Sequence, residues 1–320
     1  EDTFIIGLEN GGIKLFSTKE EKLIDITIPG VAFDLSTWKV HDLMEDSQGN
    51  IWVGAFHTGL MGIPKSMYGF ESVDLGDRGY LGTAGVCVTS IVADTESGSL
   101  WVGTDGKGLY HLGKDGRRTT LNSGNSSLSN NSIMSLKMDK RGTLWIATYL
   151  DGLYTWSQSE GIRAFRDQDA LNTSRTMCLE YSEEEDLLYV GTNGQGLSII
   201  SPAEQKVVST YAEDDYKWVS TLYIDKSGTL WVGTYNGPMY LDRKAGKLVN
   251  CAYNESLSTR IYSFCESLDG KIWLGTGEGL ARLDRQTKET VTYSEGNGLP
   301  SNVVNNILEG NDGNLWISTV

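Results

Sequence analysis

The chain has 320 residues, with 42 Asp or Glu against 27 Lys or Arg, so its formal net charge is −15. A charge of that sign repels nucleic acid and anionic membrane surfaces, which disfavours a polyanionic partner unless a local basic patch holds it. No apolar run approaches the ~20 residues of a membrane-spanning helix. The 38 glycines against 5 prolines are typical of many tight turns between strands.

One phrase recurs about every 42 to 49 residues: an apolar residue, Trp or Tyr, an aliphatic residue, a small residue and usually Thr, with a Gly-Leu-type pair soon after. A degenerate copy opens the chain at Phe4, and the others begin at Ile51, Leu100, Leu144, Leu188, Leu230, Ile272 and Leu315. A period of this size with several short strands per unit predicts a β-propeller.

Four strands follow from each copy, taken in chain order. A first strand begins about twelve positions before the aromatic residue, at Val40, Val88, Ile133, Met177, Val219, Ile261 and Val304. A polar hairpin follows, and in three copies it has an Asp six positions before the Trp, at Asp46, Asp139 and Asp225. Gly in this turn supplies a positive φ and the Asp binds turn amides. The phrase is the second strand, the Gly-Leu run opens the third, and a variable segment makes the fourth, so each unit is an antiparallel meander.

The recurring ring has a structural role in this interpretation. We expect it to pack against the next blade, and the small residue two positions later to leave room for the ring. Three of the four cysteines, Cys87, Cys178 and Cys265, lie in first strands, where buried free thiols are expected, and no Cys-x-x-Cys pattern indicates a metal site.

The blade count follows from the two ends. Residues 39 to 293 make six blades, and residues 302–320 with residues 3–28 make one more. We therefore expect an all-β, seven-bladed β-propeller of four-stranded antiparallel blades, closed by a composite blade from both termini, with eight blades as the alternative. The prediction treats residues 1–320 as a single domain, excised from a longer multidomain protein.

The last copy carries a family resemblance. Gly298-Leu299-Pro300-Ser301-Asn302-Val303, then Ile307-Leu308-Glu309, then Asp312-Gly313-Asn314-Leu315-Trp316-Ile317 resembles the two-component regulator propeller repeat, and similar phrases cover essentially the whole chain. The resemblance implies a periplasmic sensor domain of an inner-membrane hybrid two-component system of gut bacteria, which binds a glycan or oligosaccharide and signals to a histidine kinase. It implies no cofactor and no catalysis in this segment. The implied partners are an oligosaccharide, adjacent sensor domains of the same chain and a second copy in a homodimer.

A meander brings the loop before the first strand and the loop between the second and third strands to one face of the propeller, where small ligands commonly bind. Aromatic rings stack on sugar faces, and short polar groups bind hydroxyls. We therefore predict ligand contacts from Trp38, Phe56, Asp105, Tyr149, Arg175, Asn193, Trp218, Tyr235 and Arg260. Trp38 and Trp218 carry most weight. The alternative is that these rings pack loops or contact a neighbouring domain.

Two other functions stay open. A propeller glycosidase or lyase needs paired carboxylates, for which Asp42, Asp105 and Glu9 are the candidates. The histidines His41, His57 and His111 occur once each and predict no repeated base or metal arrangement. A protein-interaction scaffold, or a dimerisation propeller without its own ligand, is the third possibility.

Overall fold

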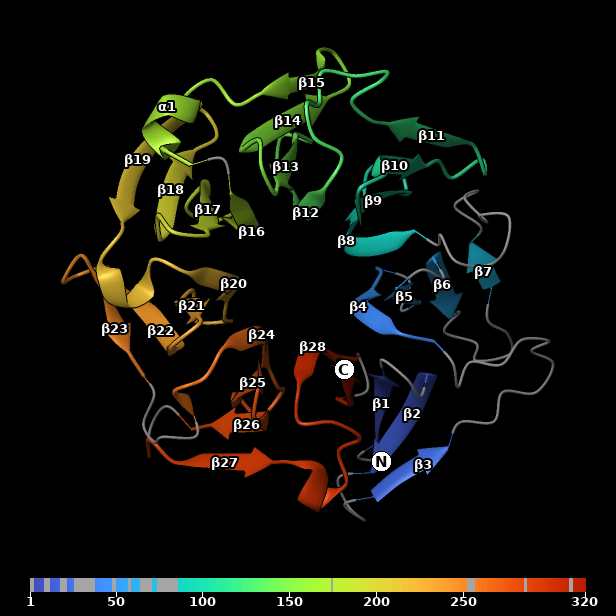
Figure 1. Ribbon diagram of the computed structural model, residues 1–320, viewed down its shortest axis with the longest axis vertical. Helices are drawn as coiled ribbons and strands as arrows, with labels where there is room; N and C mark the ends of the chain where they lie inside the picture. Colours follow the sequence, from blue (N-terminus) through green and yellow to red (C-terminus); the bar gives the residue numbers. More distant parts are fainter. Residues whose placement is uncertain are drawn as a thin grey trace. The chain divides into compact units, whose positions relative to one another are not determined.

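The computed structural model describes residues 3–8, 12–17, 22–25, 38–47, 50–56, 59–63, 71–73, 86–173, 175–251, 257–284, 287–310 and 313–320 (Figure 1). The chain is an all-β propeller of four-stranded antiparallel blades. It divides into two compact units, residues 89–251 in one and residues 1–88 with 252–320 in the other. No helix within the described ranges is long and apolar enough to cross a membrane.

The unit of residues 89–251 contains four blades, apart from the first two residues of β8. Their first strands are β8 (Cys87–Asp94), β12 (Ile133–Met138), β16 (Thr176–Ser182) and β20 (Val219–Ile224). Their second strands are β9 (Ser99–Asp105), β13 (Leu144–Thr148), β17 (Leu187–Thr192) and β21 (Leu230–Thr234). Their third strands are β10 (Gly108–Leu112), β14 (Leu153–Ser157), β18 (Leu197–Ser201) and β22 (Gly237–Asp242). Their fourth strands are β11 (Arg118–Leu121), β15 (Gly161–Ala164), β19 (Lys206–Tyr211) and β23 (Lys247–Asn250), and a short helix, α1 (Gln168–Leu171), follows β15.

The unit that holds both chain ends contains two more four-stranded blades and one larger sheet. One blade is β4 (Val40–Glu45), β5 (Ile51–Ala55), β6 (Gly59–Ile63) and β7 (Glu71–Val73). The other is β24 (Ile261–Glu266), β25 (Ile272–Thr276), β26 (Gly279–Leu283) and β27 (Thr290–Tyr293). The larger sheet joins β28 (Val304–Glu309) and β29 (Leu315–Thr319) to β1 (Thr3–Leu8), β2 (Gly12–Ser17) and β3 (Lys22–Asp25).

The larger sheet corrects the predicted blade count. It has five strands, and β1 lies parallel to β29, with Ile6 opposite Ile317 and Gly7 opposite Ser318. These pairs occupy equivalent positions of the repeat, so two second strands lie side by side in one sheet. Six sheets, not seven, are therefore four-stranded antiparallel blades in the described part of the chain. Closure of the propeller by the two ends and the single-domain organisation stay predictions.

The recurring aromatic rings do pack between blades, as predicted. Trp145 of one blade lies in a buried cluster with Leu179 and Tyr181 of the following blade, and Tyr189 lies with Leu222 and Leu230 of the blade after that. The rings thus fill the space between neighbouring sheets with apolar surface, the main favourable contribution to such a fold.

The small residue of the phrase has a different role from the one predicted. A Cβ added to Gly103 would lie 2.8 Å from Cγ2 of Ile133, at the start of the next blade's first strand. A Cβ on Gly191 would lie 2.5 Å from Cγ1 of Val219 in the same relation. The small residue therefore makes room for a β-branched residue of the next first strand and not for an aromatic ring, because the two backbones approach too closely for a side chain.

The hairpin Asp binds the indole of the following Trp as well as the turn. In the blade that begins with β20, Oδ1 of Asp225 accepts from the backbone N–H groups of Ser227 and Thr229, at 3.0 and 2.9 Å. Its Oδ2 accepts from Nε1 of Trp231 at 2.9 Å. Asp139 and Asp46 hold Trp145 and Trp52 in the same way, at 2.9 and 3.0 Å. The turn role was predicted, and the indole bond explains the fixed spacing of six.

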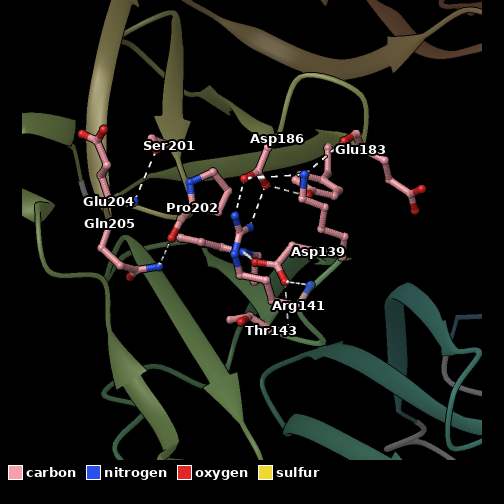
Figure 2. A network of polar contacts seen from close by, with 12 residues as sticks. Asp139, Arg141, Thr143, Glu183, Asp186, Ser201, Pro202, Glu204 and Gln205 are labelled. Atoms are coloured by element: carbon pink, nitrogen blue, oxygen red, sulfur yellow. Dashed lines mark hydrogen bonds and ion pairs between the residues drawn. The ribbon is translucent and has the colours of Figure 1, made fainter.

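The blade that begins with β16 uses a different turn, and Figure 2 shows its polar contacts. Asp186 replaces the usual Gly and adopts a positive φ of 55°. Its carboxylate accepts from both terminal nitrogens of Arg141, from the hairpin of the preceding blade, and from the Tyr181 hydroxyl at 2.8 Å. The hydrogen bond from Arg141 holds the pKa of Asp186 well below its usual range. Burial of the Tyr181 hydroxyl, together with its hydrogen bond to Asp186, raises the pKa of Tyr181 to about 12. The ion pair thus supports a backbone conformation that normally favours glycine.

None of the four cysteines forms a disulfide. Cys178 and Cys265 are buried, as predicted for first strands, whereas Cys87 is only partly buried; Cys251, for which no burial was predicted, is buried too. Burial raises the pKa of the Cys178 thiol, which keeps it protonated.

Replacement of Asp225 by Ala should lower the free energy of unfolding by about 2 to 4 kcal/mol, because a buried indole N–H and two turn amides lose their acceptor. Asp242→Ala is the matched control, since within the described part of the chain Asp242 binds two exposed turn amides, those of Lys244 and Ala245. It should cost less than ~1 kcal/mol. Urea unfolding followed by tryptophan fluorescence measures both, and equal losses would contradict the role of the indole bond.

Replacement of Gly103 by Ala should destabilise the chain by about 1 to 3 kcal/mol, because the added methyl group overlaps Ile133. Ile133→Ala should recover part of that loss in the double variant, giving a favourable coupling energy in a double-mutant cycle. Gly296→Ala is the control, since its Cβ would lie 3.5 Å from the nearest atom, Oγ of Ser294. Additive losses at residues 103 and 133 would show that the two sites do not touch.

Candidate functional site

A repeated backbone hydrogen bond joins the two loops in five of the four-stranded blades. The residue four positions after the aromatic donates its N–H to the carbonyl of the residue before the first strand. The donor and acceptor pairs are Phe56 to Lys39 at 2.6 Å, Tyr149 to Ser132 at 3.0 Å, Asn193 to Arg175 at 2.9 Å, Tyr235 to Trp218 at 3.2 Å and Gly277 to Arg260 at 3.1 Å. The two loops therefore meet within these five blades, as the meander predicts.

The Thr that ends the phrase shapes the second loop. Its hydroxyl donates to the carbonyl of the Gly that opens the third strand, at 2.8 Å from Thr148 to Gly152 and at 2.9 Å from Thr192 to Gly196. Both glycines have positive φ, 75° and 70°. A Cβ on Gly196 would lie 1.9 Å from the carbonyl oxygen of Tyr211. The Thr and Gly of the repeat thus fix a tight turn, a role that the sequence pattern did not reveal.

One blade differs from the predicted register. In the blade of Tyr189 the first strand begins at Thr176, thirteen positions before the aromatic, and not at Met177. Its hairpin region is one residue longer, because Tyr181 pairs with Leu188 where Met138 pairs with Leu144. Arg175 is consequently the structural equivalent of Trp218 one blade further on.

In the unit of residues 89–251, backbone contacts place five of the predicted residues in one row. Asn193 lies between Arg175, whose carbonyl accepts from it, and Trp218, with which it forms an isolated β-bridge. Tyr235 follows Trp218 through its backbone bond. We call Tyr149, Arg175, Asn193, Trp218 and Tyr235 the rim row.

Tyr149 reaches the rim row from the preceding blade. Its neighbour Thr148 donates its backbone N–H to Oγ1 of Thr176 at 3.0 Å, and that hydroxyl donates to the carbonyl of Gly152 at 2.7 Å. Thr176 directly follows Arg175. Arg175 therefore lies between the loop of Tyr149 on one side and Asn193 on the other.

The side chains of the rim row present both rings and polar groups. Tyr149 and Trp218 are among the few large apolar side chains with substantial exposure, at 39% and 38%. The rings of Trp218 and Tyr235 pack edge to face with centroids 6.0 Å apart. Arg175 is exposed, whereas Oδ1 of Asn193 is closed off from solvent and accepts no hydrogen bond within the described residues. Two exposed rings on either side of a cation and an amide form a polar and aromatic surface.

Asp105 lies elsewhere in the same unit. It ends β9 and is exposed, next to Gly106, which donates its N–H to the carbonyl of Asn131 in the following blade at 3.2 Å. It occupies the equivalent loop, two blades before the one that contributes Arg175. Its carboxylate is therefore not a member of the rim row.

The remaining predicted residues belong to the other unit and are engaged in local packing. Trp38 is buried, with 7% of its surface exposed, which removes its ring from the surface where a ligand was expected. The ring of Phe56 stacks on His41 at 5.2 Å. The guanidinium of Arg260 lies 4.7 Å from the ring centroid of Tyr262. For these residues the geometry matches the packing alternative that the sequence left open.

Asp42 lies on an inner strand and not at the loops. Its Oδ1 accepts from the backbone N–H of Leu43 at 3.0 Å and from Nδ2 of Asn306 on β28. Burial raises the pKa of Asp42 to about 7, against the lowering effect of these two bonds. Its described side-chain partner is thus an amide and not a second carboxylate. Glu9 and His57 lie outside the described residues.

No group of three or more His, Cys, Asp or Glu side chains in the described ranges is arranged so that it could hold a metal ion. Nε2 of His111 instead forms a hydrogen bond with Oγ of Ser99 at 2.8 Å. The His111 ring stacks on the Trp101 ring, with centroids 4.1 Å apart. Desolvation lowers its pKa, although Asp94 opposes that effect. This is the packing role predicted for an isolated histidine.

The family model of the two component regulator propeller matches residues 36–57, 127–150, 214–236 and 298–320. No curated protein matches the chain.

Solved structures share the fold. The extracellular domain of a putative hybrid two component system from B. thetaiotaomicron has a TM-score of 0.70 at 21% identity, with 88% of this chain covered. This chain spans only 38% of the length of that domain. A catalytically inactive virginiamycin B lyase from Staphylococcus aureus, solved with quinupristin, also has a TM-score of 0.70, at 11% identity, with 88% of this chain and 92% of the lyase covered.

The raised pKa of Asp42 predicts a pH effect on stability. Between pH 4 and 7 the folded state holds the Asp42 proton and the unfolded state does not, so the free energy of unfolding contributed by this residue falls as pH rises through that window. Asp42→Asn should remove this loss, amounting to about 2 to 4 kcal/mol at pH 7.5 relative to pH 4. Urea unfolding of both proteins at several pH values gives the difference, and a parallel pH dependence would refute the assignment.

Proposed function

Because the chain carries two-component regulator propeller repeats, we propose that it is a periplasmic sensor domain of a hybrid two-component system. In this proposal it binds a glycan or oligosaccharide and passes the signal to a histidine kinase located elsewhere in a longer protein. Its further partners are adjacent sensor domains of the same chain and a second copy in the full-length dimer. The fold shared with an extracellular domain of such a system supports this choice.

The rim row is the observation that carries the proposal. Tyr149 and Trp218 expose flat apolar rings, and a pyranose presents an apolar ring face that stacks on such surfaces. Arg175 lies between them, is exposed and provides donors for hydroxyl groups, and the backbone of Asn193 joins it to Trp218. The row is built on loops that the Thr and Gly turns and the repeated backbone bonds hold in place, which preorganises a binding surface.

A propeller hydrolase or lyase is the second candidate function. The observation that favours it is Asp42, since a carboxyl group with a pKa near 7 suits general acid or base catalysis. Against it, the described partner of Asp42 is the Asn306 amide, whereas glycoside hydrolysis requires a pair of carboxylates. We therefore favour binding without turnover. Mass spectrometry of candidate oligosaccharides after incubation with the chain separates the two functions, because only an enzyme generates products.

Replacement of Trp218 by Ala should weaken oligosaccharide binding about five- to thirtyfold, since a stacked aromatic platform contributes roughly 1 to 2 kcal/mol. Isothermal titration calorimetry with a panel of oligosaccharides, first on the unaltered chain and then on the variant, measures the change. Circular dichroism of the variant checks that the blades remain folded.

Two further variants sharpen the result. Val208→Ala changes a side chain of β19 that is 52% exposed and lies outside the rim row, and it should bind as the unaltered chain does. Tyr149→Ala tests the other exposed ring of the row. A ligand of the panel whose affinity survives both Trp218→Ala and Tyr149→Ala would place the binding site elsewhere, and a panel without any binder would remove the sensor proposal itself.

A further inference from the structure

We propose that the rim row binds an anionic sugar, a uronic acid residue whose carboxylate pairs with Arg175 while a sugar ring of the same oligosaccharide stacks on a flanking aromatic side chain. This inference rests on the proposed sensor function and adds the chemical class of the ligand. It concerns only the unit of residues 89–251, to which all members of the row belong.

The geometry places a cation and two rings within the span of a short saccharide. Arg175 and Trp218 are equivalent residues of neighbouring blades, and Asn193 is bonded to one and bridged to the other. Arg175 is paired with Asn193 and Asn193 with Trp218, and paired backbones lie ~4.8 Å apart. The backbones of Arg175 and Trp218 are therefore roughly 10 Å apart along the row. Tyr149 flanks Arg175 from the opposite side through the Thr148 and Thr176 bonds. One sugar residue over a ring thus leaves a carboxylate on the same or the next residue within reach of the long Arg175 side chain.

The charge of Arg175 is available to a ligand. Its guanidinium forms no ion pair with any residue in the described ranges, and the residue is exposed. By contrast Lys217, the nearest cation in sequence to Trp218, has its Nζ 2.8 Å from Oδ1 of Asp214. Arg141 and Arg243 are likewise paired, with Asp186 and Glu185. An unpaired arginine between exposed rings is therefore a distinct local feature of a chain whose net charge is −15.

The shape of the guanidinium selects among acidic and neutral sugars. Its planar fork of donors matches the two oxygens of a carboxylate, and such charge-assisted pairs are about twice as strong as neutral hydrogen bonds. A hydroxyl group offers only one acceptor oxygen without charge. The negative charge of the rest of the chain opposes any anion, so a preference for an acidic sugar would have to arise from this cation and would weaken with added salt.

The test compares two ligands that differ only at the carboxyl groups, which are charged in one and methyl esters in the other: a trimer of galacturonic acid and its fully methyl-esterified form. Calorimetric titration of the unaltered chain at low ionic strength should show the acid binding at least about fivefold more tightly than the ester. Arg175→Gln should bring the two affinities within about twofold of each other, and Arg175→Lys should restore part of the preference. Lys217→Gln is the matched control, because that cation is already paired with Asp214, and it should leave the preference unchanged.

The outcomes separate this inference from the function on which it rests. Equal affinity for acid and ester, or a preference that survives Arg175→Gln, would overturn the anionic class. A rim site would still stand in that case if Trp218→Ala weakens binding of the same ligands. Absence of binding by both trimers also overturns the anionic class. Only the additional failure of every neutral oligosaccharide in the panel would then count against the sensor function.

Discussion

The close approach of each second strand to the first strand of the next blade is the contact on which the rest of the fold depends. Gly103 faces Ile133 and Gly191 faces Val219 at distances that leave no room for a side chain. The β-branched residues favour the strand conformation, and the glycine lets the sheets approach until the large aromatic rings fill the space beside them. A single blade is thus of low stability alone and is stabilised by its contact with the neighbouring blade, which is the energetic basis of repeat folds.

Much of this architecture was predictable from the repeat phrase. The strand order, the turn role of Asp139 and Asp225, the inter-blade packing of Trp145 and the buried thiol of Cys178 were all predicted correctly. The partner of the phrase glycine was not, because a one-dimensional pattern shows that a position must be small and does not show what lies against it. The five-stranded sheet was also missed, since nothing in the sequence of β1 and β29 indicates that two equivalent strands pair in parallel.

The positions of the candidate site residues were predictable in part, whereas their contact with a ligand stays a prediction. Counting from each aromatic brought Arg175, Asn193, Trp218 and Tyr235 together correctly, because loop positions are fixed by the strands on either side. Exposure was not predictable in the same way. Trp38 and Trp218 hold nearly the same place in their copies, yet one is buried and the other is on the surface, because side-chain packing within each blade decides the outcome. Loop position follows the repeat, whereas chemical availability depends on non-repeating neighbours.

The turn at Asp186 bears on how such arrays evolve. Its left-handed backbone is stabilised by a carboxylate that binds Arg141 of the preceding blade, so the residue tolerated at one position depends on the residue present at another, 45 positions earlier. Loss of Arg141 would leave Lys140 and the Tyr181 hydroxyl as the remaining partners of Asp186, whereas loss of Asp186 would remove the carboxylate that Arg141 binds. Exchange of a single blade across that junction would separate two residues that bind each other, a dependence between repeats that the repeat phrase by itself does not reveal.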